Sequence, residues 1–193
     1  GKAFFGLGDK AGNLNMRKRA YENWCTDSFG FVESDDTLYR AIPFYYGLYE
    51  NIGYGIFMDN TFKTRFSFDR KGNEISSFSA NGGEMNYYFI AGPQLVDVTK
   101  QYMQLTGKPE LPPLWALGFH QCKWSYYPES VVREVADGFR KREIPCDSIY
   151  LDIDYMDDFR CFTWNKTAFP NPIQLVKDLQ KDGFQTVVMI DPG

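Results

Sequence analysis

The stretch SIYLDIDYMDDFRCFTWN, Ser148 to Asn165, sets an apolar, strand-like run directly against a cluster of aspartates. Residues 148–153 form the apolar run, and four carboxylates lie within it and after it: Asp152, Asp154, Asp157 and Asp158. Clustered carboxylates repel one another and lose hydration when they are buried. The pattern therefore indicates either a site for a polar ligand or a solvated turn.

The sequence on both sides of this stretch alternates between strand and helix patterns. We predict strands at residues 114–119, 148–153 and 185–190, and helices at residues 128–142 and 171–181. In the first helix, Val131, Val135 and Phe139 are expected to face inward. The strands are continuously apolar, which is typical of parallel strands buried on both faces. The repeat of roughly 35 residues fits one β/α unit, so the pattern predicts either a doubly wound sheet or the opening of a (β/α)8 barrel.

Polar and aromatic residues gather where these strands end, which is where both architectures bind their ligands. They are His120, Cys122, Lys123 and Trp124 after the first strand, Asp152 and Asp154 after the second, and Asp191 after the third. In a continuing strand Asp152 and Asp154 would share one face, unless the strand has bent by then. Carboxylates accept hydrogen bonds from sugar hydroxyls, and an aromatic ring stacks on the C–H face of a sugar. Carbohydrate chemistry is therefore one function that this pattern indicates.

The first half of the chain has a different rhythm, with short β-type runs separated by Gly, Asn and Asp turns. We predict strands at residues 41–49, 54–58, 62–68, 74–80 and 85–90, which together favour an antiparallel β-sandwich. The apolar residues between Val96 and Leu105 are spaced as in a helix, which we expect to end at Gly107, and the stiff segment from Lys108 to Pro113 follows it. We therefore expect two domains, at residues 1–107 and 108–193.

The composition excludes several classes of partner. A net charge of −4 and a pI near 5.1 argue against a nucleic-acid or anionic-membrane surface. The one basic run, residues 17–19, is expected to be a solvated loop. No apolar stretch approaches the roughly 18 residues of a membrane span. The four cysteines form no CxxC pair and His120 is the single histidine, so we expect free thiols, no metal and no cofactor.

Ordered segments along nearly the whole chain carry a family resemblance. They include FFGLGDKAG, NWCTDSF, LYRAIPFYYGL, YGIFMDNTF, LTGKPELPPLWALGFHQCKWSYY, IPCDSIYLDIDYMDDFRCFTWN and VVMIDPG. Together they resemble glycoside hydrolase family 31, the retaining α-glucosidases and their relatives. The resemblance implies a β-sandwich followed by a (β/α)8 TIM barrel, of which this chain holds the first β/α units, strands 1–3. It also implies that the sandwich lends the barrel an active-site loop, here near residues 24–30.

The resemblance further implies roles for individual residues in binding an oligosaccharide or α-glucoside substrate. Asp152 matches the aspartate that binds hydroxyls of the terminal glucose in the −1 subsite, and Ile153 and Ile190 match apolar residues lining that subsite. Trp124 matches an aromatic wall near the scissile bond, and Asp27 matches the aspartate of the sandwich loop. Asp154, Asp191 and Arg160 are second-tier candidates, and Asp157 joins them in shaping the loop at the strand end.

No catalytic residue is expected in this chain. Retaining glycosidases use two carboxylates about 5 to 5.5 Å apart, a nucleophile and an acid/base. The family resemblance implies that both lie C-terminal to Gly193, so we expect the N-terminal part of an enzyme whose partner is the remainder of the barrel. The piece alone should hydrolyse nothing, and its bare parallel edge should aggregate or unfold.

Three alternatives stay open on the sequence alone. An α-xylosidase or a transglucosidase of the same family differs only in substrate or acceptor. A non-catalytic carbohydrate-binding β-sandwich module would require an exposed aromatic platform, whereas most aromatics here alternate with polar residues as core residues do. A nucleotide-binding domain is disfavoured because no glycine-rich loop follows any of the three predicted parallel strands.

Overall fold

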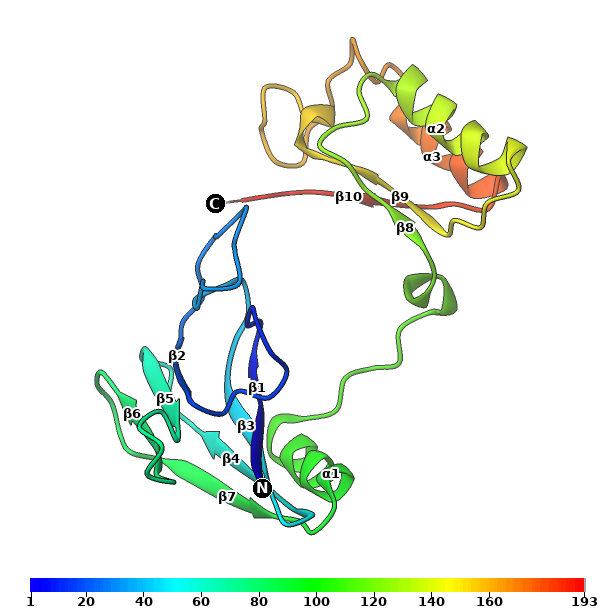
Figure 1. Ribbon diagram of the computed structural model, residues 1–193. Coiled ribbons are helices and arrows are strands. Elements are labelled where there is room, and N and C mark those ends of the chain that lie inside the picture. The colour runs from blue at the N-terminus through cyan, green and yellow to red at the C-terminus, as the bar shows by residue number, and fades with distance from the viewer. Residues whose placement is uncertain (193) are drawn as a thin grey trace. The chain divides into compact units, whose positions relative to one another are not determined.

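The computed structural model describes residues 1–192 and divides the chain into two compact units, Gly1–Pro109 and Glu110–Gly193 (Figure 1). This division falls two residues beyond the expected boundary at 107/108. Each unit has its own sheets and its own core, so each is described by itself.

The N-terminal unit is built from two antiparallel sheets. Its strands are β1 (Lys2–Gly8), β2 (Arg19–Asn23), β3 (Ala41–Tyr49), β4 (Ile52–Met58), β5 (Thr64–Phe68), β6 (Ser76–Ala80) and β7 (Tyr87–Ala91). One sheet has the order β1-β3-β4-β7 and the other the order β2-β5-β6. The predicted sandwich is thus confirmed, although neither β1 nor β2 was among the predicted strands.

Alternation along the strands builds the core of this unit. In β5, Thr64, Phe66 and Phe68 are buried while Arg65 between them is exposed, as expected for a strand with one face against a partner sheet. The ring of Phe68 stacks on Phe4 of β1, with centroids 4.6 Å apart. Aromatic contacts of this kind join the inner faces of the two sheets.

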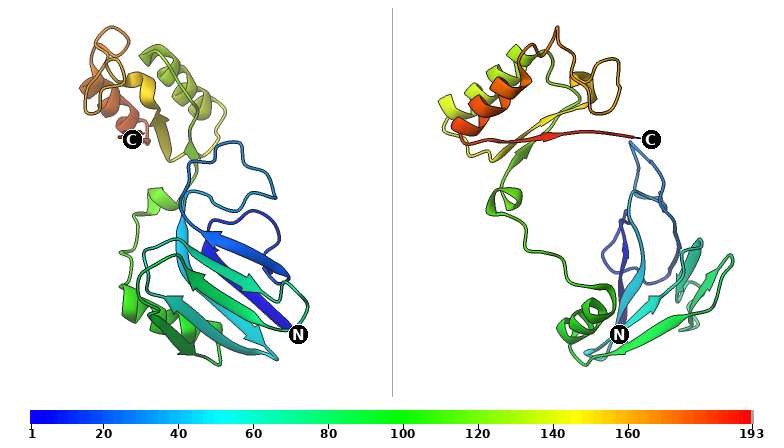
Figure 2. Two further views of the ribbon diagram at one scale, coloured as in Figure 1. Left: turned by 90° about the vertical axis from the view of Figure 1, so that its left-hand side faces the viewer. Right: turned by 180° about the vertical axis from the view of Figure 1, so that it is seen from behind.

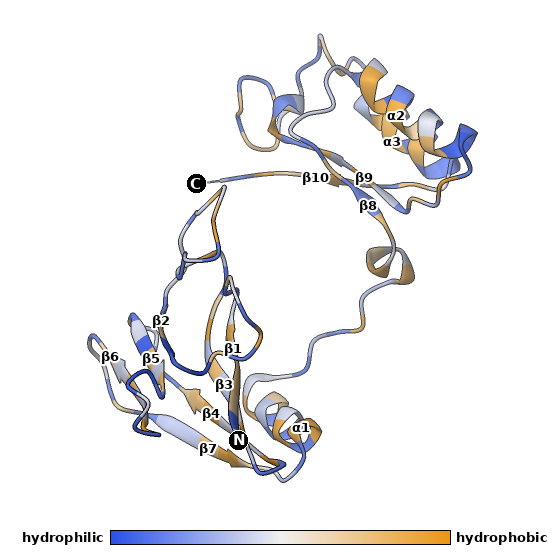
Figure 3. Cartoon of the chain, in the orientation of Figure 1, coloured by the Kyte–Doolittle hydropathy of each residue, from blue (hydrophilic) through white to orange (hydrophobic). Residues whose placement is uncertain are grey.

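Helix α1 (Leu95–Thr106) covers the other face of the four-stranded sheet. Val98 is its fully buried residue and packs with Phe44 and Ile90. Tyr102 stacks on Phe44, with ring centroids 4.1 Å apart. Figure 3 shows hydrophobic residues along this helix and the strands beneath it. As predicted, the helix ends before Gly107, whose φ of 91° is readily adopted by glycine.

The basic run at residues 17–19 is not the solvated loop that the sequence suggested. Arg17 donates from Nε and Nη2 to Oδ2 of Asp69, at 3.0 and 2.8 Å. The Asp69 side chain is 1% exposed, and Arg19 is the first residue of β2. This prediction was wrong because a buried carboxylate 52 positions away in the chain requires a cation, and no local pattern reveals it.

The C-terminal unit contains three parallel strands in the order β10-β9-β8. The strands are β8 (His120–Gln121), β9 (Ser148–Leu151) and β10 (Gln185–Val188), and the helices α2 (Glu129–Lys141) and α3 (Pro172–Lys181) connect them. Both helices lie on the same face of the sheet (Figure 2). This β-α-β-α-β order is the predicted start of a (β/α)8 barrel.

The core of this unit lies between the sheet and its two helices. Ile149 and Leu151 of β9 are buried against Val132 of α2 and Leu175 of α3. The predicted Val131, Val135 and Phe139 of α2 are partly buried and pack against this core, while the buried residues of the helix are Val132 and Ala136. The inward stripe is turned by one residue from the prediction, because the small Ala136 was left out of the apolar pattern.

The strand predicted at residues 114–119 is wrong. Residues Leu114–Leu117 form the 3₁₀ helix η1, and the first strand begins only at His120. Pro113 precedes η1 in an extended conformation, and the N–H of Gly118 closes the turn on the carbonyl of Trp115. A short apolar run does not distinguish a strand from a helical turn, and the preceding prolines favour a turn here.

Candidate functional site

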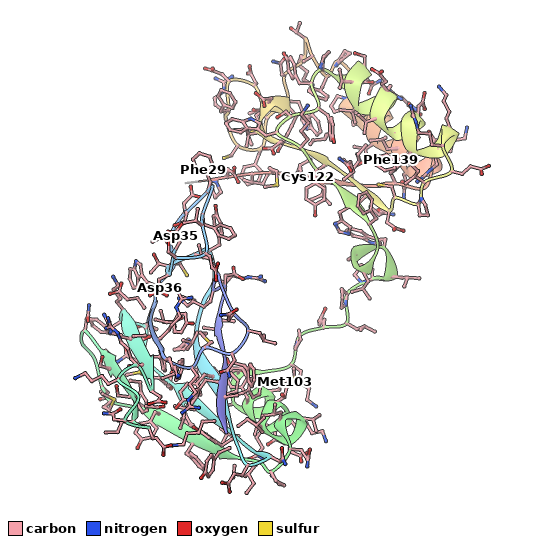
Figure 4. The ribbon with its side chains drawn as sticks, viewed as in Figure 1. Phe29, Asp35, Asp36, Met103, Cys122 and Phe139 are labelled. Carbon is pink, nitrogen blue, oxygen red and sulfur yellow. The ribbon has the colours of Figure 1, made fainter. Side chains whose placement is uncertain are left out.

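The candidate site lies at the carboxyl edge of the parallel sheet, where the chain leaves β8, β9 and β10. Because the three strands are parallel and adjacent, residues 122–124, 152–154 and 189–191 follow the same edge. Figure 4 labels Cys122 directly after β8. The structure therefore brings the loops that carry most of the predicted site residues to one edge of the sheet.

Asp152 occupies the bend at the end of β9. The strand ends at Leu151, and Asp152 caps the 3₁₀ helix η2 (Ile153–Tyr155) by accepting a hydrogen bond from the N–H of Ile153 at 2.8 Å. The strand thus bends at Asp152, which is the exception under which Asp152 and Asp154 were not expected to share a strand face. Asp152 is half-buried, and across residues 1–192 only this backbone bond engages its carboxylate. The remaining lone pairs can accept further donors.

The negative charge of Asp152 acts on the thiol of Cys122. Burial raises the pKa of the Cys122 thiol, and the carboxylate of Asp152 raises it further. Both effects disfavour the thiolate, the reactive form of cysteine. Cys122 is exposed, and its thiol form is favoured by these two effects.

Asp154 holds the loop that follows β8. Its Oδ2 accepts a hydrogen bond from Nε1 of Trp124 at 3.0 Å and a second, short one from the hydroxyl of Ser125. The Trp124 side chain is 74% exposed, so its ring faces are open to a ligand. The second-tier expectation for Asp154 was that it shapes the strand-end loop through hydrogen bonds. The two hydrogen bonds show that the groups it holds are the indole of Trp124 and the hydroxyl of Ser125.

The two isoleucines differ in their surroundings. Ile153 is half-buried and packs against the core of the unit. Ile190 is also half-buried, and its carbonyl accepts a hydrogen bond from the thiol of Cys161 at 3.3 Å. Asp191, the next residue, is exposed and has a φ of 41°.

Arg160 and Asp157 form a pair away from Asp152. The Arg160 guanidinium donates to Asp157 three residues earlier in the chain, and both side chains are at least half exposed. The hydroxyl of Thr163 accepts from the N–H of Asp157 at 3.0 Å. These contacts shape the loop between η2 and α3.

Asp27 belongs to the N-terminal unit, on the loop that joins β2 to β3. Figure 4 labels Phe29 at the tip of this loop and Asp36 nearer its base. Asp27 is exposed, and the pKa of Tyr39 is raised by loss of hydration and then by the negative charge of Asp27. A backbone hydrogen bond joins the two sides of the loop, since the N–H of Thr26 donates to the carbonyl of Leu38 at 2.8 Å. Asp27 is thus carried on an ordered loop.

Sequence reasoning missed Tyr155, which joins two strand ends. Its hydroxyl donates to the carbonyl of Met189 at 2.9 Å, just beyond β10, and its ring is 3% exposed. The available signal was a tyrosine placed directly after the DID stretch, since a buried Tyr hydroxyl requires a partner. His120, by contrast, is engaged within the unit: its Nδ1 lies 3.0 Å from the Tyr150 hydroxyl and its Nε2 lies 3.2 Å from the Trp115 carbonyl.

A separate hollow of about 480 Å³ lies in the N-terminal unit. Its walls include Trp24 and Phe62, which are 46% and 53% exposed. Among residues 1–192, no three His, Cys, Asp or Glu side chains are grouped as metal ligands. The helices of this part of the chain are all too short or too polar to cross a membrane.

Comparison with known proteins agrees with this arrangement. The family model described as the glycosyl hydrolases family 31 TIM-barrel domain matches residues 109–193, and the one described as the glycosyl hydrolase 31 N-terminal galactose mutarotase-like domain matches residues 1–67. The chain belongs to glycoside hydrolase family 31.

Similar family 31 proteins differ in their named activities. Alpha-glucosidase 2 of Bacillus thermoamyloliquefaciens is 44% identical over 98% of this chain and 24% of its own length. Alpha-xylosidase 1 of Arabidopsis thaliana is 32% identical over 99% of this chain and 21% of its own length.

A solved structure shows the same fold. The family 31 dextranase of Flavobacterium johnsoniae, in a variant complexed with isomaltotriose, has a TM-score of 0.90 and 46% identity over 97% of this chain and 23% of that one. The chain therefore spans about a quarter of the length of these family 31 relatives.

Proposed function

We propose that this chain supplies the sandwich and the first three barrel strands of an exo-acting retaining α-glucosidase that hydrolyses terminal α-linked glucose from oligosaccharides. The observation that carries the proposal is the pair of Asp152 and Trp124 at the carboxyl edge of the sheet. Asp152, at the end of β9, keeps lone pairs that can accept further hydrogen bonds. Trp124 exposes its ring in the loop that follows the adjacent strand β8. The 44% identity to an enzyme named an alpha-glucosidase supports the same assignment.

In this proposal Asp152 accepts hydrogen bonds from hydroxyls of the terminal glucose in the −1 subsite. A carboxylate is suited to this because hydrogen bonds to a charged acceptor are shorter and stronger than those between neutral groups. Ile153 and Ile190 line the apolar side of the sugar. Trp124 stacks on the part of the substrate near the scissile bond.

The nucleophile and the acid/base are expected on the remaining barrel strands, so the 193-residue chain alone is predicted to release no glucose. The reason is chemical, because a retaining mechanism requires two carboxylates about 5 to 5.5 Å apart, and none of the carboxylates in residues 1–192 is assigned to that pair. Release of glucose by the purified chain would contradict this part of the proposal.

The test is a matched pair of variants in the complete enzyme containing this chain. Asp152→Asn keeps the size of the side chain and removes its charge, while Asp158→Asn makes the same change at an exposed position of the same loop. A hydrogen bond to a charged group contributes about 1.5–3 kcal/mol, and two such bonds in the transition state predict that Asp152→Asn lowers kcat/KM at least about 100-fold. Asp158→Asn should leave kcat/KM within about twofold, since surface changes are worth within about 0.5 kcal/mol.

Hydrolysis of 4-nitrophenyl α-D-glucoside gives the rate, and proton NMR gives the anomer. Initial release of α-glucose is expected from a retaining enzyme. Equal activity of the two variants would remove Asp152 from the substrate site. Faster cleavage of the α-xyloside than of the α-glucoside would favour the xylosidase alternative.

The hollow in the N-terminal unit supports a second candidate, a carbohydrate-binding sandwich. Trp24 and Phe62 provide half-exposed rings on which a sugar can stack. Titration of the 193-residue chain with maltotriose tests it, with fluorescence as the readout. Saturable binding that Trp24→Ala abolishes and Trp124→Ala preserves would favour this candidate.

A further inference from the structure

An exposed tryptophan is not by itself a sugar-binding surface. The Trp124 side chain is 74% exposed, and its two side-chain torsions would sample several rotamers in water. Stacking requires one fixed ring plane, and fixing a mobile side chain on binding costs about 0.5–1.5 kcal/mol. A group that holds the indole before substrate arrives would remove this cost.

Asp154 provides such a hold. The indole N–H of Trp124 donates to Oδ2 of Asp154 at 3.0 Å, and the neighbouring Ser125 hydroxyl donates to the same oxygen. Both bonds have an ionised acceptor, which makes them stronger than bonds between neutral groups. Two consecutive residues of the loop after β8 are therefore tied to one carboxylate 29 and 30 positions away in the chain.

The backbone that carries Asp154 is itself fixed on both sides. Ile153 packs against the core of the unit, and Tyr155 is 3% exposed. The N–H of Tyr155 donates to the carbonyl of Asp152 at 3.2 Å, and the carbonyl of Tyr155 accepts from the N–H of Asn165 at 2.8 Å. Because η2 is held by packing and by hydrogen bonds, the Asp154 carboxylate is a rigid support.

The same short helix carries the proposed glucose-binding residue. Asp152 is the cap of η2, and Asp154 is its second residue. One rigid turn thus fixes the carboxylate that binds the terminal sugar and the carboxylate that holds the tryptophan. The hydrogen bond from Trp124 and the cap hydrogen bond from the N–H of Ile153 use different carboxylates, those of Asp154 and Asp152.

We propose that Asp154 is a positioning residue that sets the ring plane of Trp124 and so determines how tightly the enzyme holds the sugar on the leaving-group side of the scissile bond. This inference rests on the proposed function for its consequence in catalysis. The hold of Asp154 on Trp124 is independent of that function and is tested separately.

The first experiment measures the hold in the complete enzyme that contains this chain. The enzyme is labelled with 5-fluorotryptophan, and Trp124→Phe assigns the fluorine resonance of Trp124. Asp154→Asn should shift the Trp124 resonance and narrow it, because the released indole moves faster. Asp158→Asn, an equal change of charge in the same loop, should leave the resonance in place. An unshifted Trp124 resonance in Asp154→Asn would overturn the proposal.

The second experiment measures the consequence in the complete enzyme, with maltose as substrate. Asp154→Asn is expected to raise KM about tenfold and to keep kcat within about twofold, as for loss of binding that ground and transition states share. Trp124→Phe removes the same N–H donor and should act similarly. If Asp154 acts through Trp124, the double variant is no worse than either single variant.

The two experiments separate the possible failures. Additive effects of the two substitutions on KM would overturn the positioning role, since they would show that Asp154 acts on substrate by another route. If the complete enzyme cleaves no α-glucoside while the Trp124 resonance still responds to Asp154→Asn, the proposed function fails. The positioning of Trp124 by Asp154 then stands as a property of the loop.

Discussion

At the scale of single residues, the most constrained charge of the N-terminal unit is Asp69. Its carboxylate is 1% exposed, and its two oxygens accept from the Arg17 guanidinium and from the N–H of Glu74 at 2.7 Å. The hydrogen bond from Arg17 is the main cause that lowers the pKa of Asp69, followed by the bond from Glu74. Asp69 thereby closes the turn between β5 and β6.

This geometry predicts a pH-dependent contribution of Asp69 to stability. A lowered pKa in the folded state means that the contribution is present above the unfolded pKa, about 3.9, and is lost as pH falls through the folded value. Asp69→Asn should therefore lower the free energy of unfolding of the N-terminal unit at pH 7, and the difference from the unsubstituted chain should shrink towards pH 3. Urea unfolding can be followed through the fluorine resonance of Trp24, the one tryptophan of residues 1–109. A difference that is equal at both pH values would show that the Arg17 contact contributes nothing electrostatic.

Single residues also show which features of the candidate site could be predicted from the sequence. Asp152 and Trp124 were placed at strand ends from local patterns, and the structure has them there. The bond between Trp124 and Asp154 could not be predicted, because a contact across 30 positions leaves no periodic signal. The same holds for Arg17 and Asp69. Partners of buried or held side chains are properties of the folded chain, while strand ends are properties of short segments.

At the scale of elements, helix α3 shows how a local signal fixes a boundary. Its cap residue Asn171 accepts from the N–H of Gln174 at 3.1 Å, and Pro172 occupies the first helical turn. Both are favoured at helix starts, because the first N–H groups lack partners within the helix. The sequence pattern therefore predicted the start of this helix at Asn171.

Removal of the cap should destabilise the C-terminal unit measurably. Asn171→Ala is expected to lower its free energy of unfolding by about 0.5–2 kcal/mol, whereas Asn171→Asp keeps an acceptor and should retain most of it. Urea unfolding can be followed through the fluorine resonance of Trp164, which packs on Phe169. Equal losses in the two variants would mean that the side-chain acceptor is not what holds the helix start.

Elements were predicted less well where a strand is very short or where the chain turns tightly at its end. β8 has only two residues, so the apolar run before it was assigned as the strand instead. In β9 the apolar pattern continues through Ile153, yet the chain bends at Asp152 because its side chain caps η2. Long strands and helices carry enough periodicity to be predicted, while a two-residue strand does not.

At the scale of the whole molecule, the C-terminal unit has an open sheet. β10 pairs with β9 on one side only, and Val188 near its end is 36% exposed. An unpaired edge of this kind offers N–H and C=O groups to another chain. The 193-residue chain is therefore predicted to self-associate at the edge of β10.

Sedimentation velocity over a range of concentrations tests this prediction. Val188→Lys adds a charge at the edge and should shift association to higher concentration. Gln180→Lys adds the same charge at an exposed position of α3 and should leave association unchanged. Loss of association in both variants would indicate that net charge, and not the strand edge, governs it.

The sheet order β10-β9-β8 also has a consequence for biosynthesis. Each strand pairs with the strand that the ribosome made just before it, so every pairing closes only one β/α unit of chain. Synthesis delivers about 5–20 residues per second, and sequence-local pairings form fast on this timescale. β8 and β9 can thus join while α3 is still being translated. The free edge of β10 is thus the last part of this sheet to form.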